Sequence, residues 1–191
     1  MADERGTQFF TNFEQLFKEI PSVAINEDVF KTIGTSAGKD FYVITAGKEA
    51  YYNSMIGSGG GLGTFFRKPT AWNILRADRY TLEMIEKERS YTLSYFPDEF
   101  KRQALILGDT SGRDSEKMKK IELTAIQTPS GNMTFKESRL IIECKLQAIT
   151  VIGPEDICSQ EAKDFVSEEY KEENHYRKIV FGEITHVWVK N

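Results

Sequence analysis

The chain has 191 residues, of which 40% are hydrophobic, and this suits one well-packed domain over residues 1–191. The formal net charge of −4 argues against binding to nucleic acid, because neutralising phosphates needs an excess of Lys and Arg. No apolar run is long enough to cross a membrane, and the start Met1–Arg5 is charged. We therefore expect a soluble cytoplasmic protein without a membrane partner.

Aromatic residues near the start of the chain recur at helical spacing after Thr7, and Pro21 ends the pattern. This spacing predicts an amphipathic helix within residues 1–20, whose apolar side packs on the core or on a partner subunit. The next strong pattern, Phe41–Thr45, is β-branched and aromatic and predicts a strand that Ala46-Gly47 ends.

The stretch from Tyr51 to Phe96 predicts strand, Gly-rich bend, strand, turn and strand, then a helix over Thr81–Glu88 and a strand from Ser90. Glycines in this stretch indicate a bulge, a close approach by a ligand or another backbone, or a flexible hairpin loop. They are Gly57, Gly59, Gly60, Gly61 and Gly63. Together with Arg76 and Arg79, their backbone N–H groups could serve one anionic ligand.

A helix is expected from Pro97 to Leu107, with Gly108 as its stop. The loop after it, Gly108–Asp114, leads into a further predicted helix from Ser115, with Arg113 and Lys117 one helical turn apart. This segment could hold an anion at a helix N-terminus. Capping by Ser111 or Asp114, with solvated basic residues, is the alternative.

The last third of the chain predicts two strands, Leu140–Ile149 and Ile179–Val189, the second kinked at Gly182. Between them, residues 155–175 are acidic and predict a partly helical surface excursion. Several strands interrupted by short helices, without regular strand–helix alternation, favour an antiparallel barrel over a parallel sheet.

Most catalytic and metal-binding patterns are missing from the sequence. His175 and His186 lack the spacing of a metal site, and Cys144 and Cys158 form neither a metal-binding set nor a disulfide framework. There is no nucleophile elbow, no P-loop and no G-x-G-x-x-G that opens a helix. With no evident general acid or base, the pattern suits a protein whose cofactor performs the chemistry.

Four segments, in order along the chain, resemble the flavin reductase-like, FMN-binding split-barrel family of the flavoredoxin group. Tyr52–Gly63 is similar to the family's N-[ST]-M-T-A-S-W-G-G-L-G, and Arg76–Thr81 to its R-P-x-R-Y-T. Gly108–Lys117 resembles G-x-x-S-G-R-D-x-x-K, and Phe181–Ile184 resembles the terminal G-E-I strand.

The resemblance implies a mainly β fold with short helices, a six-stranded antiparallel Greek-key split β-barrel. It also implies a homodimer with FMN near the subunit interface. Carried over position by position, the flavin and its ribityl chain would meet Asn53, Ser54, Met55, Ile56, Gly57 and Ser58. The phosphate and ribityl end would meet Arg76, Arg79, Tyr80 and Thr81, and the remaining wall would be Ser111, Gly112, Arg113 and Lys117.

The chain departs from the family pattern at several positions. Ile56 replaces Thr and Gly59 replaces Trp, and each loss is expected to weaken FMN binding by roughly 1 kcal/mol, unless Gly59 instead widens the pocket. Ala77 replaces Pro, which leaves the turn less rigid. Arg177 stands where many relatives have a His, and His175 lies two residues earlier.

The resemblance implies an oxidoreductase in which NADH or NADPH delivers hydride to the flavin N5, without a catalytic side chain or a metal. Electrons would then pass to free flavin, ferric iron or an electron-acceptor protein. A second hypothesis is a carrier module that binds FMN or haem without nicotinamide activity, which Gly59 and His175 motivate. A third is a barrel with only a structural role.

Overall fold

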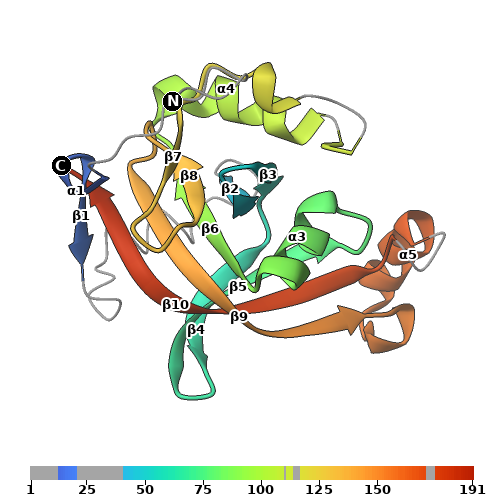
Figure 1. The fold of residues 1–191 in the computed structure, drawn as a ribbon. Coiled ribbons are helices and arrows are strands. Elements are labelled where there is room, and N and C mark those ends of the chain that lie inside the picture. Colours follow the sequence, from blue (N-terminus) through green and yellow to red (C-terminus); the bar gives the residue numbers. More distant parts are fainter. Residues whose placement is uncertain (1–12, 21–40, 110, 114–116, 171–174) are drawn as a thin grey trace.

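The computed structural model describes residues 13–20, 41–109, 111–113, 117–170 and 175–191. Strands dominate this part of the chain (Figure 1). Eight of them form one antiparallel sheet, in the order β3-β2-β6-β9-β10-β5-β4, with β1 beside β10. β7 and β8 form a separate hairpin. The mainly β class with short helices is therefore confirmed, although the sheet has eight strands and not the six expected.

The bounds of the elements are as follows. The main sheet contains β1 (Phe17–Ile20), β2 (Tyr42–Lys48), β3 (Tyr51–Gly57), β4 (Gly60–Phe65), β5 (Lys68–Arg76), β6 (Ser90–Tyr95), β9 (Leu140–Ile152) and β10 (Arg177–Lys190). The hairpin contains β7 (Ala125–Gln127) and β8 (Met133–Phe135). The helices are α1 (Phe13–Leu16), α3 (Tyr80–Glu88), α4 (Asp98–Asp109) and α5 (Gln160–Glu169), with 3₁₀ turns η1 (Lys117–Lys119) and η2 (Pro154–Asp156).

The main sheet curls, so that β2 and β5 meet although three strands separate them in the sheet order. Asn73 on β5 donates its side-chain amide to the hydroxyl of Tyr42 on β2, at 2.9 Å. The Tyr42 hydroxyl donates in turn to the carbonyl of Gly59, at 2.7 Å. Tyr91 on β6 donates to the Asn73 carbonyl oxygen at 3.1 Å. These bonds satisfy polar groups inside the curl and hold its two sides together.

Both faces of β2 are buried. Its sequence is apolar at successive positions because successive side chains point to opposite faces of the sheet. Ile44 faces the interior of the curl, where it packs with Leu82 and Ile85 of α3. Val43 faces the other way, toward Leu107 of α4 and the hairpin β7–β8. In consequence β2 and its neighbour β3 have α3 on one side and α4 on the other (Figure 1).

The kink expected at Gly182 is confirmed, because the pairing of β10 with β9 shifts register between Phe181 and Gly182. A Cβ at position 182 would lie 2.8 Å from the Cβ of Cys144 and would overlap the hydroxyl of Tyr91. Glycine therefore lets β10 pass close to β6 and β9 at this point.

The helix expected within residues 1–20 is wrong for Phe17–Ile20, which form β1 and pair with the last residues of β10. Only Phe13–Leu16 are helical, and Thr7 lies outside the described residues. Backbone pairing with β10 and the burial of Phe17, which is 1% exposed, outweigh the helical spacing at Phe17–Ile20.

Two more boundaries differ from expectation. Helix α4 does not stop at Gly108 but continues to Asp109. Gly108 lies against Ile56, where a Cβ would be 3.1 Å from Cδ1, so glycine at this position lets α4 pack closely on β3. The helix predicted from Ser115 begins outside the described residues, and Lys117–Lys119 form a 3₁₀ turn. Within the acidic segment 155–175, the structure places α5. None of the described helices has the length and apolar character needed to cross a membrane.

Candidate functional site

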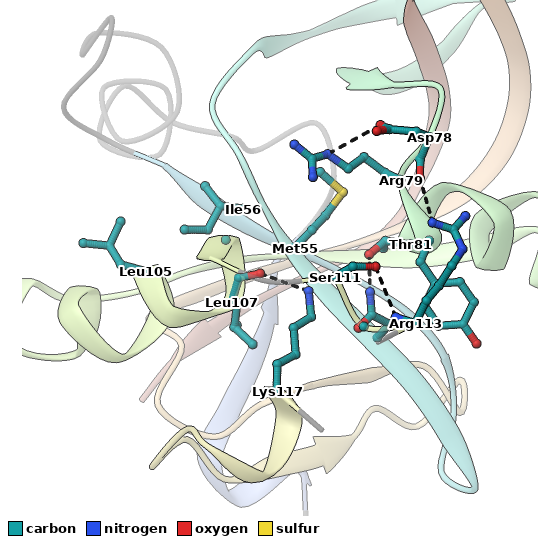
Figure 2. Close-up of a pocket in the computed structure, with 14 residues that line it drawn as sticks. Met55, Ile56, Asp78, Arg79, Thr81, Leu105, Leu107, Ser111, Arg113 and Lys117 are labelled. Carbon is teal, nitrogen blue, oxygen red and sulfur yellow. Dashed lines mark hydrogen bonds and ion pairs between the residues drawn. The ribbon is translucent and has the colours of Figure 1, made fainter. Parts of the chain in front are cut away.

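A cavity of about 600 Å³ opens beside β3, the strand at one edge of the main sheet (Figure 2). Because β3 is an edge strand, side chains from both of its faces reach the cavity. The start of α3, the end of α4, the segment 111–113 and η1 complete the wall. The lining residues are Asn53, Met55, Ile56, Asp78, Arg79, Tyr80, Thr81, Leu105, Leu107, Gly108, Ser111, Gly112, Arg113 and Lys117.

A buried amide anchors one wall of the cavity. Asn53 donates its Nδ2 to the hydroxyl of Thr81 at 2.8 Å, and both side chains are almost fully buried. Gly112 lies directly against this amide, where a Cβ would overlap Oδ1 of Asn53. Only glycine lets the segment 111–113 come this close to β3.

Two cations, Arg79 and Lys117, extend into the cavity from opposite sides (Figure 2). Lys117 is 3% exposed and donates its Nζ to the carbonyl of Leu107 at 3.0 Å. Burial, and to a smaller extent the positive charge of Arg79, lower the pKa of Lys117 to about 8. An anionic ligand between the two cations would relieve this repulsion.

The N-terminus of α3 adds to the positive potential. Arg79 is its N-cap residue in an extended conformation, and no side chain among the described residues caps the helix there. The first N–H groups of a helix lack intrahelical acceptors and favour a negative charge. Since Tyr80 and Thr81 of this first turn line the cavity, an anion bound there would meet a helix N-terminus.

Arg76 and Asp78 form a bidentate ion pair beside the cavity. Arg76 donates Nε to Oδ1 of Asp78 at 3.1 Å and Nη2 to Oδ2 at 2.6 Å. Asp78 lines the cavity, whereas Arg76 does not. The Nε of Arg79 lies 4.0 Å from Oδ1 of the same carboxylate.

Arg113 fastens the segment 111–113 to the start of α3. It donates Nη1 to the backbone carbonyl of Asp78 at 2.9 Å and forms an ion pair with Glu83. Its guanidinium also lies over the ring of Tyr80, 5.3 Å from the centroid. Most of the interactions that the Arg113 guanidinium can make are therefore used within the protein.

The opposite part of the lining is apolar. Met55 and Ile56 come from β3, and Leu105 and Leu107 from α4 (Figure 2). Leu105 is 49% exposed. A cavity with one cationic side and one apolar side suits a ligand that joins a flat apolar ring system to an anionic group.

The structure brings together most of the residues that the resemblance assigns to the cofactor. Those that line the cavity are Asn53, Met55, Ile56, Arg79, Tyr80, Thr81, Ser111, Gly112, Arg113 and Lys117. Those that do not line it are Ser54, Gly57, Ser58 and Arg76. Their roles toward a cofactor stay predictions.

The residues outside the cavity have other surroundings. Ser54 is fully buried and shares a hydrogen bond of 2.8 Å with Thr45. Gly57 lies against the ring of Tyr42, where a Cβ would be 2.6 Å from Cε2. Ser58 is exposed, and Gly59 faces Ile74. Gly59 is not among the residues that line the cavity.

The sequence motifs did not indicate four of the lining residues, Asp78, Leu105, Leu107 and Gly108. Asp78 lies inside the Arg76–Arg79 segment and could have been noticed as the only acidic side chain there. The α4 residues reach the cavity because α4 packs against β3, a contact that their own sequence does not indicate. Among the described residues, no His, Cys, Asp or Glu cluster is arranged to hold a metal.

A family model described as "Flavin reductase like domain" matches residues 68–191. The match begins at β5 and so includes α3, α4 and all later elements. It covers well over half of the chain. No curated protein sequence matches the chain.

Solved structures share the fold. The FMN-binding protein from Thermus thermophilus, with bound 1-cyclohex-2-enone, has a TM-score of 0.60 at 17% identity, over 78% of this chain and 70% of that chain. A protein with a split barrel domain from Shewanella frigidimarina NCIMB 400 has a TM-score of 0.62 at 20% identity, over 96% of this chain and 80% of that chain. Flavoredoxin of Desulfovibrio vulgaris (Miyazaki F) has a TM-score of 0.57 at 22% identity, over 78% of this chain and 68% of that chain.

At these identities the likeness establishes the fold, while the family model matches the sequence itself. The antiparallel sheet, the short helices and the match over residues 68–191 agree with each other. This chain therefore belongs to the flavin reductase-like domain family and has its split-barrel fold.

Proposed function

We propose that the cavity at β3 binds FMN, and that the chain is a flavin reductase-like oxidoreductase that uses NADH or NADPH. The observation that carries this proposal is the division of the cavity into a cationic side and an apolar side, in a member of this family. Bound FMN would supply the electron-accepting ring system, which none of the lining side chains can replace.

Each part of FMN has a counterpart in the lining. A phosphate monoester, which carries up to two charges, suits Arg79, Lys117 and the start of α3. Thr81 and Ser111 offer hydroxyl groups to a ribityl chain. Met55, Ile56 and Leu105 offer an apolar surface to the ring system and exclude water from one side of it.

The experiment has two stages. Purified protein is first mixed with FMN and freed of unbound flavin, and the retained flavin is measured by its visible absorbance. NADH or NADPH is then added without oxygen, and loss of the flavin absorbance shows reduction. Absence of retained FMN would refute the proposed cofactor, and retained FMN that neither nucleotide reduces would refute the reductase activity.

A carrier module without nicotinamide activity is the second candidate. Neither His175 nor Arg177 lines the described cavity, although many relatives have a His at the position of Arg177. FMN that is retained but not reduced by either nucleotide would favour this candidate. A Soret band in the untreated protein would favour haem over FMN.

We also propose that the chain forms a homodimer with the cofactor near the subunit interface. This proposal rests on membership of the flavin reductase-like domain family, to which the matched residues 68–191 belong. Light scattering during size-exclusion chromatography tests it. The electron acceptor, whether free flavin, ferric iron or another protein, and the cytoplasmic location remain predictions.

A further inference from the structure

The turn between β5 and α3 carries three charged side chains with different surroundings. Arg76 uses two nitrogen atoms on the Asp78 carboxylate, at 3.1 and 2.6 Å, and stays outside the cavity lining. Asp78 and Arg79 do line the cavity. One guanidinium is thus committed to a protein carboxylate, and that carboxylate faces the space where an anion is expected.

Arg79 is less firmly held by the same carboxylate. Its Nε is 4.0 Å from Oδ1 of Asp78, the outer limit for an ion pair, and its side chain is 43% exposed. On the other side of the cavity, Lys117 is buried and senses the charge of Arg79. Figure 2 shows the Arg79 and Lys117 side chains entering from different elements, with Met55 between them in the view.

Asp78 can compete with an anionic ligand for Arg79, because both carry negative charge and both suit a guanidinium. The strength of this competition depends on Arg76. While Arg76 neutralises Asp78 through two bonds, the carboxylate attracts Arg79 weakly. Without Arg76, the same carboxylate would be an uncompensated charge 4.0 Å from Arg79.

We propose that Arg76 and Asp78 form a positioning pair that sets the affinity of the cavity for anions, and that the anionic group of the ligand binds between Arg79 and Lys117. This inference rests on the proposed function for the identity of the ligand as FMN. Arg76 then acts on the ligand only through Asp78. Arg79 and Lys117 are the residues that contact the phosphate.

The proposal predicts an unusual pattern among variants. Arg79→Ala and Lys117→Met each lower the affinity for FMN by about tenfold or more, because each removes a charged contact to the phosphate. Arg76→Ala lowers it by a smaller factor, about three- to tenfold, because Asp78 then pairs with Arg79. Adding Asp78→Asn to Arg76→Ala restores at least the original affinity, since the competing charge is gone.

The test compares the dissociation constants of FMN and riboflavin by fluorescence titration at one ionic strength. Riboflavin lacks the phosphate, so the effects of these variants should appear in the FMN constant and not in the riboflavin constant. Arg102→Ala is the matched control, because Arg102 is exposed on α4 and does not line the cavity. If Asp78→Asn fails to rescue Arg76→Ala, Arg76 contacts the ligand directly and the positioning role is refuted.

Inorganic phosphate separates this inference from the proposed function. We expect phosphate to raise the melting temperature of the original protein, with Arg79→Ala and Lys117→Met abolishing the increase. The same pattern in a protein that binds no flavin would refute the proposed cofactor and support the anion site. No increase with phosphate, together with equal affinities for FMN and riboflavin, would overturn the anion site. Arg76→Lys, which keeps a charge for Asp78, serves if Arg76→Ala does not fold.

Discussion

The side-chain amide of Asn53 donates to the hydroxyl of Thr81 at 2.8 Å, and this buried bond joins edge strand β3 to the first turn of α3. Both residues line the cavity, so the bond fixes the distance between two of its walls. A buried amide that loses its acceptor loses more than the net value of one hydrogen bond, because it cannot recover the contact with water.

Thr81→Val should therefore destabilise the protein by about 1–3 kcal/mol, because the Nδ2 of Asn53 loses its acceptor at nearly constant shape. Urea unfolding followed by tryptophan fluorescence measures the change in the free energy of unfolding. Thr64→Val is the matched control, since Thr64 is exposed on β4. Equal effects of the two substitutions would contradict the role of the Asn53–Thr81 bond.

Gly112→Ala should disturb the cavity, because the added Cβ would overlap Oδ1 of Asn53. Either the segment 111–113 moves away from β3 or the Asn53 amide turns, and both change the cavity wall. We expect the dissociation constant of FMN to rise by about tenfold or more, which corresponds to a loss of about 1.4 kcal/mol of binding free energy. Gly63→Ala is the control, because nothing lies within 4 Å of a Cβ at position 63. Unchanged FMN titrations for both variants would contradict this contact.

Clear sequence patterns predicted much of this fold. The apolar run at Phe41–Thr45 lies mostly in β2, but the predicted end at Ala46-Gly47 is wrong, because β2 continues to Lys48 in its pairing with β3. Gly182 marked a true register shift in β10. The helix predicted for Phe17–Ile20 was wrong, because the helical spacing of aromatic residues does not show that β10 offers an unpaired edge to this segment. Local patterns indicate what a segment can form, while pairing with distant segments decides between the options.

The sequence likewise predicted some parts of the candidate site and not others. The motifs at Arg79–Thr81 and Ser111–Arg113 brought their residues into one cavity. The ion pair between Arg76 and Asp78, however, depends on side-chain directions at the end of β5, and it removes a predicted phosphate ligand from the lining. Leu105 joins the cavity only through the packing of α4 against β3.

The charge of Lys117 makes stability depend on pH. Its pKa is lowered from 10.5 to about 8 in the folded protein, so folding disfavours the charged form. Between pH 8 and 10.5 the unfolded chain binds more protons at this residue, and the free energy of unfolding therefore rises with pH. Lys117→Met should consequently be more stable than the original protein below pH 8, and this advantage should shrink toward pH 10.5. Urea unfolding at several pH values measures the difference, and an advantage that is constant over this range would contradict the shifted pKa.

The same proton should govern binding of an anion. Above pH 8 the free protein loses the positive charge of Lys117, so the FMN affinity should fall as the pH rises through this value. Since Arg79 stays charged, binding weakens but persists. Fluorescence titrations of FMN between pH 6.5 and 9.5, made in buffers of equal ionic strength, test this expectation. Lys117→Met should show weaker binding without the decline near pH 8, and riboflavin, which has no phosphate, should show no decline with either protein. A decline of equal size in Lys117→Met would assign the titration to another group and leave Lys117 without a role in holding the anion.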